Sequence, residues 1–208
     1  TGGGTGIGKA IAVELGRLGA AVAIASRNPE HRETGVRAVE EAGGTAVAVA
    51  LDVREPSAVA ERFDDIEQQL GTVDILVNNA AGNFPALARD LSPNGWRAVT
   101  SIVLDGTFYC STEFARRLVD AQQSGSIINI AATYAWTGGP GTAASAAAKA
   151  GVVNLTQSLA VEWAPWNIRV NAIAPGLFPH DDHVAAMRSA RPDGYSAEGG
   201  HIPAGRTG

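Results

Sequence analysis

The feature that most constrains the fold is an alternation of short apolar runs with longer helical segments. The runs at 21–27, 73–81 and 124–132 are almost uniformly apolar, which is typical of strands buried on both faces of a parallel sheet. Between such runs lie segments with apolar residues at helical spacing, for example 8–19 and 55–71. Repeated β–α units of this kind predict an α/β domain with a doubly wound parallel sheet and helices on both faces.

The same patterns predict further elements and a single domain. A length of 208 residues fits one domain, here 1–208. Residues 178–202 are rich in Pro, Gly, His and charge and break the pattern, so we expect a mobile flap there. The remaining predicted strands are 45–53 and 167–176, and the remaining predicted helices are 30–44, 92–121 and 142–163.

Composition narrows the class of protein. Hydrophobic residues make up 45% and charged residues 18%, so we expect a packed core. The net charge of -5 leaves no basic stripe for nucleic acid, and no apolar run approaches the roughly 18 residues of a membrane span. Cys110 is the only cysteine, which excludes a disulfide within the chain and fits a reducing compartment.

Both ends of the chain are expected to be truncated. The sequence opens on a glycine loop that should follow a strand, and no strand precedes it. It stops in the loop-like sequence "IPAGRTG".

The opening "TGGGTGIG" predicts a dinucleotide site. Gly2, Gly6 and Gly8 follow a G-x-x-x-G-x-G spacing directly before a predicted helix. Glycines let the backbone turn sharply and approach a pyrophosphate, and the helix N-terminus offers free N–H groups to the anion. The alternative is an ordinary glycine turn, which the surrounding β–α–β pattern disfavours.

The predicted strand at 21–27 indicates which dinucleotide binds. An NAD site usually carries an acidic residue about 20 residues past the glycines, whereas this strand ends in Ser26 and Arg27. A guanidinium suits a 2′-phosphate, so we predict NADP(H), with a solvated strand-end arginine as the alternative. Asp52 could accept from the adenine amino group, or it could simply begin the next helix.

These motifs together resemble the short-chain dehydrogenase/reductase superfamily. The glycine loop, "NNAAG" after a strand, a helix carrying Lys149 and "NAIAPG" match its pattern up to about residue 178. The resemblance implies a Rossmann-like fold and a homotetramer. It also assigns cofactor contacts to Gly2, Thr5, Gly6, Ile7, Gly8, Ser26, Arg27, Asp52, Val53, Asn79, Ala80, Lys149, Pro175 and Gly176.

The usual catalytic residues of that superfamily are mostly absent. Its ordinary members carry an Asn on the long helix, a Ser after the fifth strand, and Tyr-x-x-x-Lys. The corresponding positions here hold Val103, Ala132 and Ser145, and Lys149 alone is retained.

The pattern of these changes resembles one subgroup, the 2,4-dienoyl-CoA reductases of the mitochondrial and bacterial type. The shared motifs are "NNAAGNF", "LSP-x-x-W" at 91–96, a tyrosine after the strand at 124–132, and Ser-x-x-x-Lys. The resemblance implies an acyl-CoA substrate, a role in fatty-acid β-oxidation, and a bacterial cytoplasm or an organelle matrix. Asp105 departs from the asparagine of the subgroup. The implied catalytic residues are Asn83, Tyr134, Ser145 and Lys149.

Such a site suits reduction of a conjugated thioester. Hydride adds at the δ carbon, and negative charge spreads to the thioester oxygen, so the protein must stabilise a dienolate. Asn83 and Tyr134 would act as neutral donors, each worth about 3 kcal/mol. Lys149 would hold the nicotinamide ribose, and Ser145 would support the ribose or Tyr134.

Other interpretations remain open. Tyr134 could line an apolar pocket, Asn83 could tie its own loop, and Ser145 could be small for packing. The chain could then reduce another carbonyl or enoyl substrate, or be a catalytically silent nucleotide-binding homologue. The segment "PHDDH" at 179–183 could hold a metal. The resemblance, however, implies a substrate lid over 178–202, so we favour a polar helix start in that lid and no metal.

Overall fold

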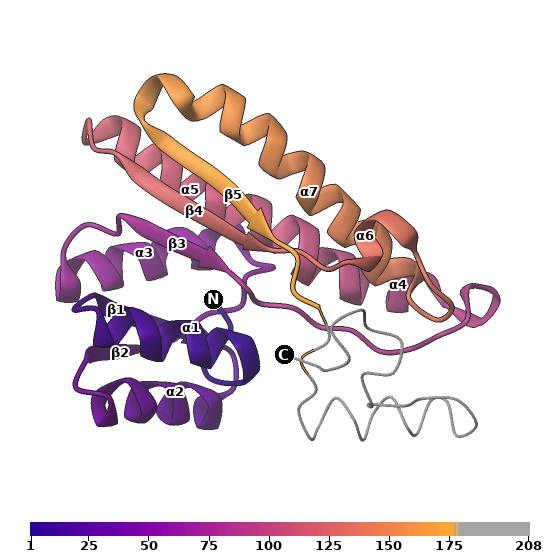
Figure 1. Ribbon diagram of the computed structural model, residues 1–208, viewed down its shortest axis with the longest axis horizontal. Helices are drawn as coiled ribbons and strands as arrows, with labels where there is room; N and C mark the ends of the chain where they lie inside the picture. Colours follow the sequence, from indigo (N-terminus) through magenta and orange to yellow (C-terminus); the bar gives the residue numbers. More distant parts are fainter. Residues whose placement is uncertain (177, 179–208) are drawn as a thin grey trace.

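The computed structural model describes residues 1–176 and 178, and it confirms an α/β fold in which helices and strands alternate (Figure 1). Most predicted elements are present, with ends shifted by a few residues. The first half of the chain consists of α1 (Gly6–Arg17), β1 (Ala21–Ser26), α2 (Pro29–Glu41), β2 (Thr45–Ala50), α3 (Pro56–Leu70) and β3 (Ile75–Asn78).

The second half departs from prediction at two places. The helix expected over 92–121 is interrupted by a π-turn, η2, and Tyr134 begins a short helix rather than lying in a loop. The elements are η1 (Ala88–Asp90), α4 (Pro93–Thr100), η2 (Ser101–Asp105), α5 (Gly106–Asp120), β4 (Gly125–Ile130), α6 (Tyr134–Thr137), α7 (Ala143–Trp163), η3 (Ala164–Trp166) and β5 (Ile168–Ile173).

All described strand pairs are parallel, as expected, but they form two sheets instead of one. β1 pairs with β2, and separately β4 lies between β3 and β5. A mainly apolar cavity of about 430 Å³ separates β1 from β3, and Thr1 and Gly8 lie at its edge. The carboxyl ends of β1 and β3 meet at the start of the chain, where the Gly2 N–H donates to the Ala25 carbonyl at 2.8 Å and the Thr1 amino group to the Val77 carbonyl at 2.7 Å.

Helices cover the strands in two layers. On one face Ala12 of α1 and Val39 of α2 pack against Ile24 of β1. On the other face α3, α5 and α7 share the larger core, which includes Phe63, Phe114, Leu118, Ile127 and Trp163. The predicted covering of both faces therefore holds for β1 and β2, whereas β5 alternates buried and exposed residues beside α7.

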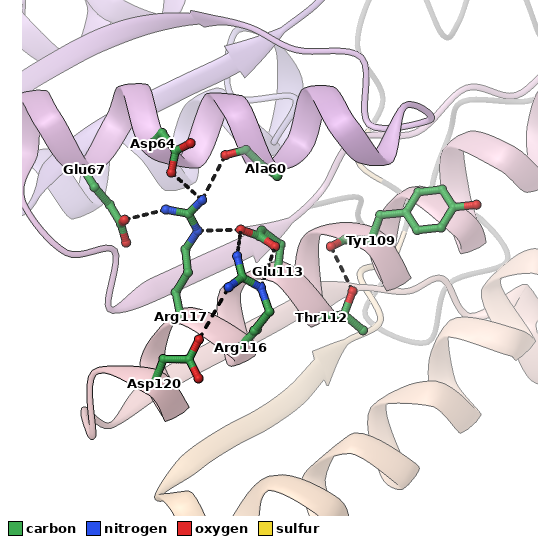
Figure 2. A network of polar contacts seen from close by, with 9 residues as sticks. All are labelled: Ala60, Asp64, Glu67, Tyr109, Thr112, Glu113, Arg116, Arg117 and Asp120. Atoms are coloured by element: carbon green, nitrogen blue, oxygen red, sulfur yellow. Dashed lines mark hydrogen bonds and ion pairs between the residues drawn. The ribbon is translucent and has the colours of Figure 1, made fainter.

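Charged side chains clamp α3 to α5 (Figure 2). Arg117 of α5 donates to Glu67 and Asp64 of α3 at 2.6 and 2.7 Å, to the Ala60 carbonyl at 3.0 Å, and to Glu113 of its own helix at 2.6 Å. Burial opposes the charge of Arg117, but these acceptors outweigh it and raise the pKa of the guanidinium. The clamp ties α5 to α3, with Arg117 and Glu113 mostly buried and Asp64 exposed.

Within residues 1–176 and 178, none of the helices combines the length and apolar character that a membrane span requires.

Candidate active site

The glycine loop is shaped to receive a dinucleotide. Gly2 and Gly6 have φ values of +63° and +51°, which side chains strongly disfavour. A Cβ atom at Gly8 would lie 2.2 Å from the Gly2 carbonyl oxygen, so only glycine fits there. Thr5 precedes α1 without a side-chain cap, which leaves the first N–H groups of the helix, from Gly6 and Ile7 onward, available to an anion.

The segment after β3 is tied to this loop. The Asn79 side chain donates to the Gly2 carbonyl at 3.0 Å, and the Thr1 hydroxyl accepts from the Asn79 and Ala80 backbone N–H groups at 3.1 and 3.0 Å. The predicted cofactor residues Asn79 and Ala80 therefore lie beside the glycines. Thr1 was not among the site residues predicted from the sequence, although its place directly before the glycines could have indicated it.

Positive charge exceeds negative charge at the end of β1. Arg27 lies 3.8 Å from Asp52 and is 56% exposed. Arg54, which was not predicted, grips both Asp52 oxygens, and its hydrogen bonds hold the pKa of that carboxyl below its usual range against the opposing effect of burial. Two guanidinium groups face one carboxylate, an arrangement that fits a phosphate monoester.

The turn carrying Ser26 and Arg27 is held in place by Arg32. Its guanidinium donates to the Ser26 and Arg27 carbonyls at 2.8 Å each. Sequence reasoning missed Arg32, since it lies inside the predicted solvated helix. Val53 is buried against Gly106, where an added Cβ atom would lie 2.6 Å from the Val53 side chain.

Tyr134 and Ser145 meet directly. The Tyr134 hydroxyl lies 2.9 Å from the Ser145 hydroxyl, and either oxygen can be the donor. Ser145 is only 2% exposed, whereas Tyr134 is half-buried at the start of α6. Tyr134 precedes Ser145 by eleven residues, but its hydroxyl thus lies next to the helix position that holds the tyrosine in ordinary members of the superfamily.

Lys149 follows one turn later on the same buried face of α7. Its ammonium donates to the Ile130 carbonyl at the end of β4. Burial lowers the pKa of Lys149 to about 8. An ammonium has three N–H donors, so two stay available for a ligand.

The position of the ordinary superfamily asparagine is filled by apolar packing. Val103 is 1% exposed and belongs to a cluster with Val99, Ala144, Ala148 and Val152. No catalytic donor is present at this point of the long helix, and Asp105 lies half-buried two residues later. Nothing in the structure explains the aspartate there.

Asn83 differs from the other predicted catalytic residues in its contacts. It is exposed, and its side chain forms no hydrogen bond with any residue that the structure describes. Its loop is nevertheless anchored near α6 and α7, because the Ala86 N–H donates to the Gly141 carbonyl at 3.2 Å. Pro175 and Gly176 follow β5, whose Ile173 carbonyl accepts from the Ala131 N–H at 2.8 Å. The segment "PHDDH" and, apart from residue 178, the predicted lid lie outside the described residues.

Known proteins share this fold and sequence. The chain is 48% identical over 177 residues (85% of this chain, 70% of the relative) to a Bacillus subtilis (strain 168) protein named probable 2,4-dienoyl-CoA reductase, (2E)-enoyl-CoA-producing. It is 44% identical over 181 residues (86% and 59%) to the Caenorhabditis elegans probable 2,4-dienoyl-CoA reductase 3, (3E)-enoyl-CoA-producing.

A solved structure and a family profile agree with these relatives. The Burkholderia cenocepacia J2315 gluconate 5-dehydrogenase, in complex with NADP and tartrate, superposes with a TM-score of 0.88 at 34% identity, covering 100% of this chain and 80% of that one. The profile of the family described as short chain dehydrogenase matches residues 1–191. With its glycine loop, its parallel strands and Lys149 all in place, the chain belongs to the short chain dehydrogenase family.

Proposed function

We propose that this oxidoreductase uses NADPH to reduce 2,4-dienoyl-CoA thioesters in fatty-acid β-oxidation. The observation that carries the proposal is the 2.9 Å contact between Tyr134 and Ser145, one helical turn from Lys149. It puts a hydroxyl donor beside the lysine although the usual tyrosine position is a serine. The names of the two relatives described above support the same substrate class.

NADPH, bound along the glycine loop, supplies the hydride. Tyr134 can donate a hydrogen bond to a thioester oxygen when Ser145 donates a hydrogen bond to the Tyr134 oxygen, a direction that the contact allows. Asn83 has no hydrogen bond to the described residues, so its amide is available as a second donor. Two neutral donors stabilise the dienolate oxygen. A proton from a bound water or from Tyr134 must then reach the α or γ carbon to complete the enoyl product.

Lys149 supplies positive charge without an ion pair. None of the ion pairs found among the described residues involves it, and its ammonium is anchored to the Ile130 carbonyl. Its two remaining N–H groups would hold the nicotinamide ribose and keep a cation close to the oxyanion. A desolvated cation acts more strongly there than it would in water.

The cofactor preference follows from the excess positive charge at the end of β1. Arg27 would contact the 2′-phosphate. Arg54 pairs with the Asp52 carboxylate and compensates its negative charge, so that Arg27 stays available to the phosphate. The proposal therefore favours NADPH over NADH.

A homotetramer is part of the proposal. Phe108 on α5 is 44% exposed and Val161 on α7 is 79% exposed, so these neighbouring helices present apolar surface. Light scattering of the purified protein should give a mass four times that of the chain, and a monomer would contradict this part.

The main experiment mixes the protein with NADPH and a medium-chain 2,4-dienoyl-CoA and follows NADPH absorbance. We expect consumption with the dienoyl-CoA and little with the matched 2-enoyl-CoA or a small ketone. The position of the remaining double bond should then be determined, because the two relatives are named for different enoyl products. NADPH binding without consumption would refute the substrate assignment, and faster reduction of the ketone would favour ordinary carbonyl reduction.

A further inference from the structure

A hydrogen-bonded chain of four buried polar side chains links α5 to α7 across strands β3 and β4. It runs from Ser111 of α5 through Asn78 of β3 and Asn129 of β4 to Thr156 of α7. Ser111 and Asn129 are 0% exposed, and Asn78 and Thr156 are 5% and 7% exposed. Buried polar groups are costly unless they are paired, so the hydrogen bonds between these side chains favour one arrangement of the elements that carry them.

The donor and acceptor of each hydrogen bond in this chain are fixed. Thr156 has a single hydroxyl proton and donates it to the Val152 carbonyl at 2.7 Å, so it must accept from the Asn129 amide at 2.9 Å. The Asn129 oxygen is thereby turned toward Asn78, whose amide donates to it at 2.9 Å and to Ser111 at 2.9 Å. Each amide can adopt only one orientation.

This hydrogen-bonded chain adjoins residues of the candidate active site on both β4 and α7. Asn129 directly precedes Ile130, whose carbonyl accepts from Lys149. Thr156 lies two helical turns after Lys149 on the buried side of α7, which Val152 shares. β4 therefore holds α7 through two polar contacts, Asn129 to Thr156 and Ile130 to Lys149.

We propose that Asn129 and Thr156 are positioning residues for the reduction. They set the register of α7 against β4, and so they place Lys149, and Ser145 beneath Tyr134, for the reaction. The effect on turnover rests on the proposed function, whereas the placement of Lys149 can be measured without it.

The test uses Thr156→Val, which keeps the side-chain shape and removes the acceptor for Asn129. We expect kcat with the dienoyl-CoA to fall about tenfold, while the KM for NADPH stays within about twofold. Thr156→Ser restores the acceptor and should restore kcat. Thr156→Ala repeats the measurement should the valine variant fail to fold.

A second measurement is independent of substrate. Lys9 and Lys149 are the only lysines of the chain, so ¹³C-lysine NMR titration reports each one separately. In Thr156→Val we expect the pKa of Lys149 to rise from about 8 toward the ordinary 10.5, because a displaced ammonium regains water. Thr156→Ser should return it to the wild-type value, and Lys9 serves as the internal reference.

Thr107→Val is the matched control. Thr107 is also buried and also donates to a carbonyl four residues earlier, but it lies outside this hydrogen-bonded chain. We expect its kcat and its Lys149 pKa to match the wild type within about twofold and a few tenths of a unit.

The outcomes separate the two proposals. A Thr156→Val protein with lower thermal stability but unchanged kcat and unchanged Lys149 pKa would overturn the positioning role. A wild-type protein without dienoyl-CoA turnover, whose Lys149 pKa still moves in Thr156→Val, would refute the proposed function and retain the positioning role.

Discussion

The junction of α3 with α5 and the junction of β4 with α7 are held by opposite kinds of polar contact. At the first, Arg117 binds three carboxylates close to the surface (Figure 2). At the second, the neutral groups of Asn129 and Thr156 bond to each other in the core. Both junctions fix a helix, but only the neutral one adjoins the candidate active site.

The difference shows where charge is tolerated. Among the described residues, carboxylates pair with arginines away from Tyr134, while Lys149 has no acidic partner. A carboxylate beside Lys149 would cancel its field where an oxyanion has to form. Neutral hydrogen bonds can position α7 without that loss.

The largest effect is expected from removing the Tyr134 hydroxyl at the candidate active site, which the neutral junction adjoins. Tyr134→Phe should lower kcat for the dienoyl-CoA by about 100- to 1000-fold, because one oxyanion donor is lost. NADPH affinity, measured by tryptophan fluorescence, should stay near wild type. Tyr109→Phe is the matched control, since Figure 2 shows Tyr109 on α5, a different helix from Tyr134. A Ser145→Ala variant more damaged than Tyr134→Phe would mean that the donor has been assigned wrongly.

At the charged junction the expected effect is on stability. Arg117→Met should lower the free energy of unfolding by about 2–3 kcal/mol, because partly buried carboxylates lose their partner. Chemical denaturation provides the measurement. Arg116→Met is the control: Arg116 is 57% exposed, and its loss should cost less than about 1 kcal/mol. Equal losses for the two variants would show that the clamp has no special role.

Arg27 tests whether surface charge can also select a ligand. Arg27→Ala should reduce the preference for NADPH over NADH, expressed as a ratio of kcat/KM, by about tenfold or more, because a charged hydrogen bond to the 2′-phosphate is lost. Arg62→Ala, which removes a partly exposed arginine of α3, should leave the ratio unchanged. A preference that survives in Arg27→Ala would exclude the phosphate contact.

The pH dependence of kcat tests whether the positive charge of Lys149 is required. Lys149 is protonated below its pKa of about 8. If the cation is required, kcat should be level below that pH and fall about tenfold per unit above it. Stability should change the opposite way: between about 8 and 10.5 the unfolded chain binds more protons at this lysine, so its contribution rises with pH. A level kcat up to pH 10 would contradict a cationic role.

Local patterns predicted much of this molecule. Apolar runs and helical spacing located the elements, and the glycine spacing located the loop that Asn79 binds. The Asn78–Asn129 pair could not be predicted, because it depends on the register that puts the two residues opposite each other on β3 and β4. The Arg117 clamp likewise joins residues about 50 positions apart.

The site was predicted unevenly for the same reason. Tyr134 and Ser145 are close in sequence, and one short helix between them brings their hydroxyls together. Asn83 lies on a long loop whose path depends on distant contacts, such as that of Ala86 with Gly141. The periodicity of the long helix also concealed its π-turn, since apolar residues at 99, 103 and 110 fit an uninterrupted helix.

That π-turn has a mechanical consequence. Helices bend preferentially where the regular hydrogen-bond ladder is interrupted. The interruption at Ser101–Asp105 separates α4, which contacts α7 near Ser145, from α5, which Arg117 clamps to α3. Flexing at this point would swing α4, together with Phe84 and Leu91 packed against its Gly95, about a stationary α5. Such a bend would change how closely α4 approaches α7, while Lys149 would keep its hydrogen bond to the Ile130 carbonyl of β4.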